Sequence, residues 1–414
     1  MRTRVAVQRR YGDVFRTGDS IAGELFHIAD RDLVERMFKW KPSEYEVAEP
    51  REVMEPVLGP ASLLLLDGER HLRMRRLMLP PFHGEAIARY AELIEAIVDR
   101  AIDGWRQGET IRTRAVAQAI TLEVMIRAVF GVADPDRVAE LKRRLPRLSS
   151  VNPLLLFAQK DLGPLSPWGR FVRNRDRVDA ILREEIRRRR EDPGEDARED
   201  ILSLLLAARD EEGRPLDDGE LRDELITILL AGHETTATSI GWAFERLLRT
   251  PAALARLTAE VKEEGAGGEY LDAVVKETLR VRPVVTEVFR SPSQPVELGG
   301  YRFEAGTQIA ASIALVQRDP SLYPPDPLAF RPERFLEGAP EPYAWIPFGG
   351  GVRRCIGASF AQLEMKIAIA RILARARLRA SREKDEKARF RGVTLLPSRG
   401  GEAVVEAVSA DPAR

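Results

Sequence analysis

Residues 347–357 read PFGGGVRRCIG and contain Cys355, the one cysteine in a chain of 414 residues. The three consecutive glycines before the cysteine have no Cβ atoms, so the backbone there can approach a flat ligand closely. Residues 358–375 have the apolar spacing of an amphipathic helix, which puts the thiol near a helix N-terminus. The helix dipole and the amide donors at that end favour the thiolate. This loop therefore predicts a thiolate in a glycine-lined slot, which suits the iron of a planar macrocycle.

A lone cysteine is more often a small buried hydrophobic residue than a ligand. Here Arg353 and Arg354 precede it and add positive charge that can pair with ligand carboxylates. A single cysteine also excludes an internal disulfide framework and any all-cysteine iron–sulfur or zinc site within this chain. The four histidines are not spaced as a metal-binding pair. Cys355 is therefore the best candidate for a metal ligand.

Composition narrows the class of protein further. Lys+Arg and Asp+Glu both count 65, so the global basic charge of a nucleic-acid-binding protein is absent. Apolar residues make up 44% and charged residues 31%, as in a globular protein. The N-terminus has no apolar region typical of a signal peptide, and no apolar stretch is long enough to span a bilayer. We expect a cytoplasmic protein, monomeric, in a reducing compartment.

Most of the chain has helical periodicity, and strand patterns are few. Helices are predicted over 84–105, 114–130, 171–190, 200–209 and 217–249, and strands within 13–28, 296–310 and 389–407. The helix over 217–249 is apolar on most faces and should cross the core, with Pro251 stopping it. The charged segment 183–200 predicts a solvated helix end and an exposed loop. The Pro-rich stretch after residue 318 predicts a long ordered loop that leads to the cysteine.

The long predicted helix contains the segment Ala231-Gly232-His233-Glu234-Thr235-Thr236. A threonine hydroxyl can bond a preceding carbonyl and bend a helix beside a glycine, which would open a notch for water or dioxygen. A carboxylate next to a hydroxyl in an apolar helix is a plausible proton relay. The alternative is that Glu234 and Thr235 are simply exposed, and the apolar flanks argue against it.

The stretch from Phe348 to Gly357 resembles the haem-binding signature of the cytochrome P450 family, in which Phe, Gly, a basic residue, Cys and Gly recur at these spacings. The resemblance implies that Cys355 is the axial ligand of the haem iron. It implies that Arg353 reaches a haem propionate and that Phe348 packs beside the sulfur. Gly349 completes the matched glycine positions.

Other segments match the family's pattern as well, from residue 11 to the C-terminal strands. Glu234 and Thr235 resemble its acid–alcohol pair, which delivers protons to iron-bound oxygen, and His233 falls at a variable position. Glu277, Arg280 and Arg334 resemble its buried Glu–Arg–Arg cluster, although a Glu–Arg pair three apart is routine on helix surfaces. His71 and Arg75 are four residues apart, hence on one face of a helix, and match two propionate-binding positions of the family. The alternative is an ordinary basic surface helix. Arg290 matches a third propionate-binding position.

The resemblance implies a mainly α fold, a helical prism with a small β-sheet region formed by one domain over residues 1–414. The haem, as haem b, would lie between the long helix and the cysteine loop. The family's first helix is shortened here, and the segment 260–270 is short. Residues that would line the substrate pocket are Leu58, Leu63, Ile228, Ala231, Val284 and Val285.

The implied function is mono-oxygenation, in which one oxygen atom from dioxygen enters a C–H bond of a small hydrophobic substrate such as a fatty acid or terpenoid. Electrons would come from a separate ferredoxin or flavodoxin. A basic face around Arg73, Arg76 and the cysteine loop is a candidate docking site for an acidic donor, and scattered surface arginines are an equal alternative. Two rival functions stay open: a peroxide-driven peroxygenase or haem-thiolate isomerase, and a non-catalytic haem- or ligand-binding protein.

Overall fold

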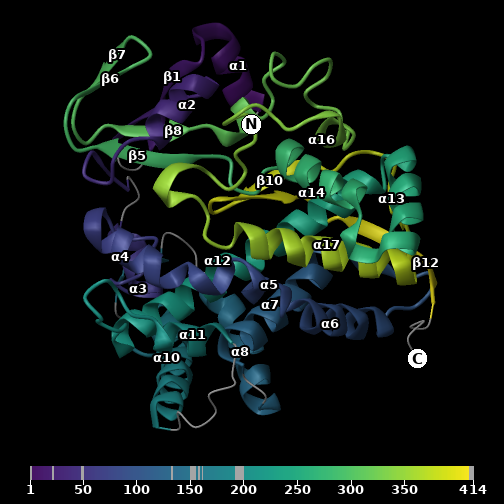
Figure 1. Ribbon diagram of the computed structural model, residues 1–414, viewed down its shortest axis with the longest axis horizontal. Helices are drawn as coiled ribbons and strands as arrows, with labels where there is room; N and C mark the ends of the chain where they lie inside the picture. The colour runs from purple at the N-terminus through teal and green to yellow at the C-terminus, as the bar shows by residue number, and fades with distance from the viewer. Residues whose placement is uncertain are drawn as a thin grey trace. The chain divides into compact units, whose positions relative to one another are not determined.

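The computed structural model describes residues 2–20, 23–47, 51–131, 134–149, 155–156, 159–160, 162–191 and 200–409. Helices make up most of these residues, and the strands form hairpins and small sheets (Figure 1). The chain divides into two compact units. The first unit comprises residues 1–49, 98–117 and 235–414, and the second comprises 50–97 and 118–234. Three helices, α6, α7 and α12, pass from one unit to the other.

Segments from both ends of the chain build the first unit. Its elements are α1 (Arg2–Tyr11), β1 (Val14–Ser20), β2 (Gly23–Ile28), α2 (Arg31–Phe38), β3 (Tyr45–Glu46), β4 (Thr110–Arg112), α13 (Pro251–Glu264), α14 (Glu269–Val281), β5 (Val288–Pro292), β6 (Val296–Leu298), β7 (Tyr301–Phe303), β8 (Gln308–Ala311), α15 (Ile313–Val316), α16 (Arg334–Glu337), α17 (Ala358–Arg375), β9 (Ala376–Ala380), β10 (Ala388–Arg391), β11 (Thr394–Pro397) and β12 (Glu402–Val408). Short 3₁₀ turns cover Gly265–Gly267 and Gly351–Arg353.

The main sheet has the strand order β1-β2-β8-β5-β3, in which only β2 and β8 are parallel. Strands β4, β12 and β9 form a second sheet. The hairpins β10–β11 and β6–β7 stand apart from both sheets, and β6–β7 turns at Gly299-Gly300. Both turn residues have positive φ, +64° and +79°, which glycine adopts without steric cost.

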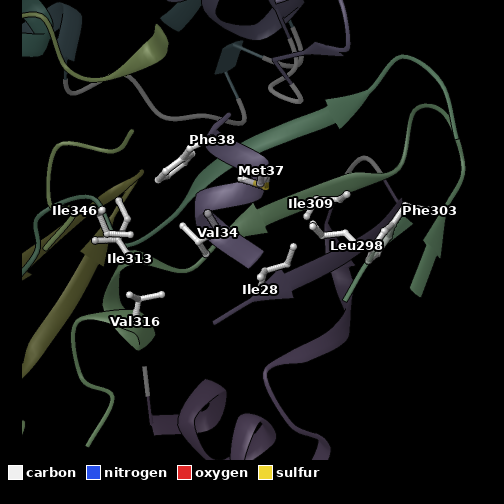
Figure 2. Packing of buried hydrophobic residues seen from close by; sticks show 11 residues of the cluster. Ile28, Val34, Met37, Phe38, Leu298, Phe303, Ile309, Ile313, Val316 and Ile346 are labelled. Atoms are coloured by element: carbon white, nitrogen blue, oxygen red, sulfur yellow. The ribbon is translucent and has the colours of Figure 1, made fainter. Parts of the chain in front are cut away.

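Helix α2 packs against the main sheet, β1-β2-β8-β5-β3. Its N-cap, Asp30, accepts a hydrogen bond from the Leu33 amide at 2.8 Å and so fixes where the helix begins. Val34, Met37 and Phe38 point from α2 into a cluster with apolar side chains of the strands and the loops that follow them (Figure 2). At about 25 cal/mol per Å² of apolar surface, this burial is the main force that holds α2 to the sheet.

The second unit is helical. Its elements, with the three shared helices, are α3 (Arg51–Leu58), α4 (Gly68–Met78), α5 (Glu85–Ala88), α6 (Ala91–Asp103), α7 (Thr113–Phe130), α8 (Pro135–Ser149), α10 (Pro167–Glu191), α11 (Ile201–Ala207) and α12 (Asp218–Leu247), with a 3₁₀ turn at Pro80–Phe82. Buried Arg189 ties three of them together, because its guanidinium donates to Glu185, Asp200 and the Phe130 carbonyl.

Most sequence-based elements are confirmed, and two need correction. The expected helix over 84–105 is two helices, because the chain turns at Arg89 and Tyr90. Pro251 does not stop α12, which ends at Leu247; it instead occupies the first turn of α13, where a missing amide costs no hydrogen bond. The exposed loop expected before residue 200 falls on 192–199, outside the described residues. No helix in the described ranges is long and apolar enough to cross a membrane.

Candidate active site

The cysteine loop folds back on itself just before α17. The Cys355 amide donates to the Phe348 carbonyl at 2.9 Å, and the Gly349 amide donates to Ile346 at 3.0 Å. Within this loop, the Arg354 amide donates to Gly351 at 3.1 Å. Cys355 is exposed and lies three residues before the first turn of α17. The thiol is therefore accessible to a ligand at the positive end of an 18-residue helix.

The glycines of this loop serve packing more than the sequence suggested. A Cβ on Gly351 would lie 2.0 Å from the carbonyl oxygen of Phe38, and one on Gly350 would lie 2.2 Å from the Phe38 ring. These two glycines let the loop approach the end of α2, so their expected role in making room for a ligand is corrected. A Cβ on Gly357 would meet nothing within 4 Å, so space for a flat group is open there.

Buried Gln317 joins the cysteine loop to α14 through side-chain hydrogen bonds. The side chain of Gln317 accepts from the Ile346 amide at 2.9 Å and donates to the Leu279 and Arg280 carbonyls at 3.1 Å. Trp345 adds a second tie through its indole N–H, which donates to the Lys276 carbonyl at 3.1 Å. The sequence analysis missed Gln317 and Phe38, since neither belongs to a motif and each acts on residues far along the chain.

Glu277, Arg280 and Arg334 lie together. The Arg280 guanidinium donates to both Glu277 carboxylate oxygens, at 2.6 and 2.8 Å, and Arg334 Nε is 3.6 Å from Glu277 Oε1. The Glu277 and Arg280 side chains are fully buried. Arg280 also donates to the Pro327 and Ala329 carbonyls, at 2.8 and 3.1 Å, which holds the Pro-rich loop.

Arg353 and Arg290 are the two candidate propionate partners in the first unit. Arg353 is half-buried in the turn before the cysteine. Arg290 is buried on β5, where its guanidinium lies 4.7 Å from the Tyr45 ring and donates to the Phe289 carbonyl. The loop and β5 adjoin, because a Cβ on Gly349 would be 3.8 Å from Val288.

Helix α12 is exposed at its first residues, 218 and 219, and opens again at a window in its middle. Residues 221–229 and 236–247 are buried, whereas Ala231 is exposed and Glu234 and Thr235 are half-buried. The helix is continuous through this segment. Gly232 has a packing role, since a Cβ there would come within 2.9 Å of Met125 on α7. His233 is buried, with Nδ1 2.7 Å from the Leu229 carbonyl.

The remaining predicted propionate partners lie on α4 in the second unit. His71 is buried and Arg75 is half-buried, one turn apart. Arg73 on the same helix is neutralised by Asp210 and Glu220, each at 2.7 Å, and Arg76 pairs with Glu211 at 2.9 Å. These ion pairs compensate the charges of Arg73 and Arg76, so at these two positions the alternative of ordinary surface arginines is favoured.

Two charged side chains of α12 hydrogen-bond to the backbone of predicted pocket residues in the second unit. The Glu224 carboxylate accepts from the Leu63 amide at 2.6 Å, and Arg222 donates to the Leu58 carbonyl at 3.2 Å. Burial raises the pKa of Glu224 to about 8, so it is protonated near neutral pH. Leu58, Leu63 and Ile228 are buried. Sequence analysis missed Glu224, because its partner is a backbone amide.

Val284 and Val285 lie in the first unit, beside the β10–β11 hairpin. The Leu395 amide donates to the Val284 carbonyl at 2.8 Å, and Val285 forms a bridge with Thr394. Val284 is buried and Val285 is half-buried.

The donor set around Cys355 fits a metal that brings its own ligands. Among the described residues no three His, Cys, Asp or Glu side chains gather in a geometry that could hold a metal ion. An ion bound by Cys355 would therefore need a further chelator. Haem would meet this need, because its porphyrin supplies further ligands and Cys355 would hold the iron through its thiolate.

Comparison with known proteins agrees with this geometry. The family model described as cytochrome P450 matches residues 3–403. A Mycobacterium tuberculosis protein named "Putative cytochrome P450 135B1" is 42% identical over 98% of this chain and 87% of its own length. Another from that organism, "Putative cytochrome P450 137", is 38% identical over 95% of this chain and 83% of its own length.

Solved structures show the same fold. The structure titled "Retinoic acid bound cyanobacterial CYP120A1" superposes with a TM-score of 0.85 and 26% identity, over 98% of this chain and 94% of that one. The cytochrome P450DA heme domain superposes with a TM-score of 0.82 and 24% identity, over 97% and 92%. With the cysteine signature and the mainly helical fold, these matches show that the chain belongs to the cytochrome P450 family of haem-dependent mono-oxygenases.

Proposed function

We propose that the Cys355 thiolate ligates the iron of haem b and that the enzyme inserts one oxygen atom from dioxygen into a C–H bond of a small hydrophobic substrate. The observation that carries this proposal is the accessible window of α12, at Ala231, Glu234 and Thr235, between the buried stretches 221–229 and 236–247. A polar acid–alcohol pair that the fold leaves accessible inside a core helix is suited to proton transfer.

Each residue of the site would have a separate task. The start of α17 and the hydrogen bond from the Cys355 amide hold the sulfur in place. Arg353, Arg290, His71 and Arg75 would bind the haem propionates, because charge-assisted hydrogen bonds to carboxylates are strong. Bound haem would supply dioxygen activation, with the thiolate favouring O–O cleavage. Glu234 and Thr235 would pass protons from water through the carboxylate and Oγ1.

Apolar side chains support a hydrophobic substrate. The predicted walls, Leu58, Leu63, Ile228, Val284 and Val285, carry no polar side-chain atom. The structurally similar CYP120A1 was solved with retinoic acid bound, which supports a long apolar substrate of the fatty-acid or terpenoid type. A screen of such compounds should find ligands that shift the haem spin state, and polar compounds of equal size should leave it unchanged.

We further propose that residues 1–414 act as one mono-oxygenase domain that receives electrons from a separate ferredoxin or flavodoxin. The cytochrome P450 match occupies residues 3–403, which supports a single mono-oxygenase domain over this range. The test is turnover of a spin-shifting substrate with a reduced ferredoxin and dioxygen, compared with peroxide alone. Donor-dependent product supports mono-oxygenation, whereas equal turnover with peroxide and no donor would identify a peroxygenase.

A further inference from the structure

The first unit contains a groove whose lining includes no residue of the cysteine loop. A groove of about 680 Å³ lies between the β4–α7 junction, the β10–β11 hairpin and the turn that leads into β12. Figure 1 labels β10 and α7, which bound it. Its charged lining consists of Arg112, Arg114, Arg389, Arg391, Arg399 and Glu402.

Backbone hydrogen bonds fix the walls of this arginine groove. The Thr113 and Arg114 amides donate to the Gly401 and Gly400 carbonyls, at 3.2 and 3.0 Å, and Glu402 pairs with Arg112 across β4 and β12. On the other side, Arg389 pairs with Leu396 in the hairpin. The arginines therefore project from strand ends and a helix start, which hold their Cα positions without a ligand.

Five arginines and one glutamate line the groove, in a chain whose formal net charge is zero. That glutamate, Glu402, pairs with Arg399. Arg399 donates to Glu402 from Nε at 3.1 Å and from Nη2 at 2.5 Å, and the Ser381 hydroxyl donates at 2.9 Å. The hydrogen bond from Arg399 lowers the pKa of Glu402, and the charge of Arg112 helps to lower it. Within the described part of the chain, the Arg112 and Arg389 side chains nevertheless form no ion pair, so their guanidinium donors are available to an anion.

The helix start adds to this field. Helix α7 has 18 residues and begins at Thr113, and Arg114 and Ala115 of its first turn line the groove. The N-terminal end of a helix carries a partial positive charge that favours anions. Arg114 is also oriented, because its Nε donates to the Thr238 hydroxyl at 3.1 Å.

We propose that the arginine groove binds an organic diphosphate. Guanidinium groups match phosphate oxygens bidentately, and several arginines on opposite walls suit two linked phosphates better than one carboxylate. The volume lies within the range of small-molecule sites, roughly 300–1,000 Å³. Phe390, which is 44% exposed, with Leu396 and Pro397 forms an apolar wall for the organic part.

Calorimetric titration of the full-length protein with inorganic pyrophosphate tests the proposal, at low salt because such binding is screened by ions. We expect saturable 1:1 binding, weakened at least tenfold by Arg112→Gln with Arg389→Gln. The control is Arg302→Gln with Arg377→Gln, two exposed arginines of the same unit outside the groove, which should leave binding unchanged. Thermal melts should show that all variants fold.

Two further titrations distinguish the sources of a diphosphate. ADP binding tighter than pyrophosphate assigns a nucleoside to the apolar wall, and a short prenyl diphosphate binding tighter assigns an isoprenoid chain. Equal binding of all three shows that the diphosphate alone is recognised. The proposal is overturned if pyrophosphate does not saturate, if inorganic phosphate binds equally well, or if both double variants lose affinity to the same degree.

Discussion

Glu364 shows what burial does to one residue near the candidate active site. It lies on α17, nine residues after Cys355, fully buried, and neither of its carboxylate oxygens has a hydrogen-bond partner within the described residues. Desolvation by burial raises its pKa from 4.5 to about 8. Glu364 is therefore protonated near neutral pH, because an unpaired buried carboxylate would cost far more than the neutral acid.

The raised pKa predicts a pH-dependent stability. The folded state holds the Glu364 proton between about pH 4.5 and 8, whereas the unfolded chain releases it, so this contribution is complete below pH 4.5 and is lost as pH rises through about 8. Between pH 6 and 9 the ionisation of Glu364 should lower the unfolding free energy of the wild type by about 2 kcal/mol. Glu364→Gln should abolish this decrease. Urea denaturation at both pH values measures it, with exposed Glu383→Gln as the control. An unchanged pH profile in Glu364→Gln would contradict the assignment.

A single glycine sets how the cysteine loop meets α2. Gly351→Ala would put a Cβ 2.0 Å from the Phe38 carbonyl at a φ of +64°, so we expect a loss of about 2 kcal/mol in unfolding free energy. Gly357→Ala is the matched control, because its Cβ would meet nothing within 4 Å. Equal stabilities of the two variants by denaturation would show that the contact with Phe38 does not constrain the loop.

At the scale of elements, the buried charge cluster joins α14 to the Pro-rich loop. Glu277→Gln removes the charge that pairs with buried Arg280, so we expect a cost of about 3–5 kcal/mol in unfolding free energy. Asp272→Asn on the same helix breaks a partly exposed pair with Lys276 at 2.6 Å and should cost about 1 kcal/mol or less. Similar costs for both variants would mean that the cluster does not lock the loop.

The α12 window makes a prediction at the same scale. Thr235→Ala should leave haem content and substrate binding in place but lower the product formed per donor electron pair several-fold, with the electrons recovered as peroxide. Neighbouring Thr236 is buried rather than accessible, so Thr236→Ala is the control and should stay coupled. Oxygen consumption, peroxide and product measured together give the coupling ratio. Full coupling in Thr235→Ala would remove Thr235 from the relay.

Across the whole molecule, the spacing of apolar residues predicted most of the helices, because helix formation depends on residues close in sequence. The spacing in 358–375 predicted α17 to the residue. Contacts distant in sequence were not predictable. Phe38 against Gly351, and Glu224 on the Leu63 amide, join segments more than 150 residues apart, and no periodicity encodes such pairs. The ion pair between Arg73 and Asp210 was not predictable for the same reason, since the two residues are 137 positions apart.

The spectrum of the reduced carbon monoxide complex reports directly whether the Cys355 sulfur binds the haem iron. The purified wild-type protein should contain haem and show the Soret band of a thiolate-ligated carbonyl complex. Cys355→Ala should lose that band while keeping its far-ultraviolet circular dichroism. A wild-type protein without haem, or a Cys355→Ala variant with the wild-type Soret position, would contradict the account.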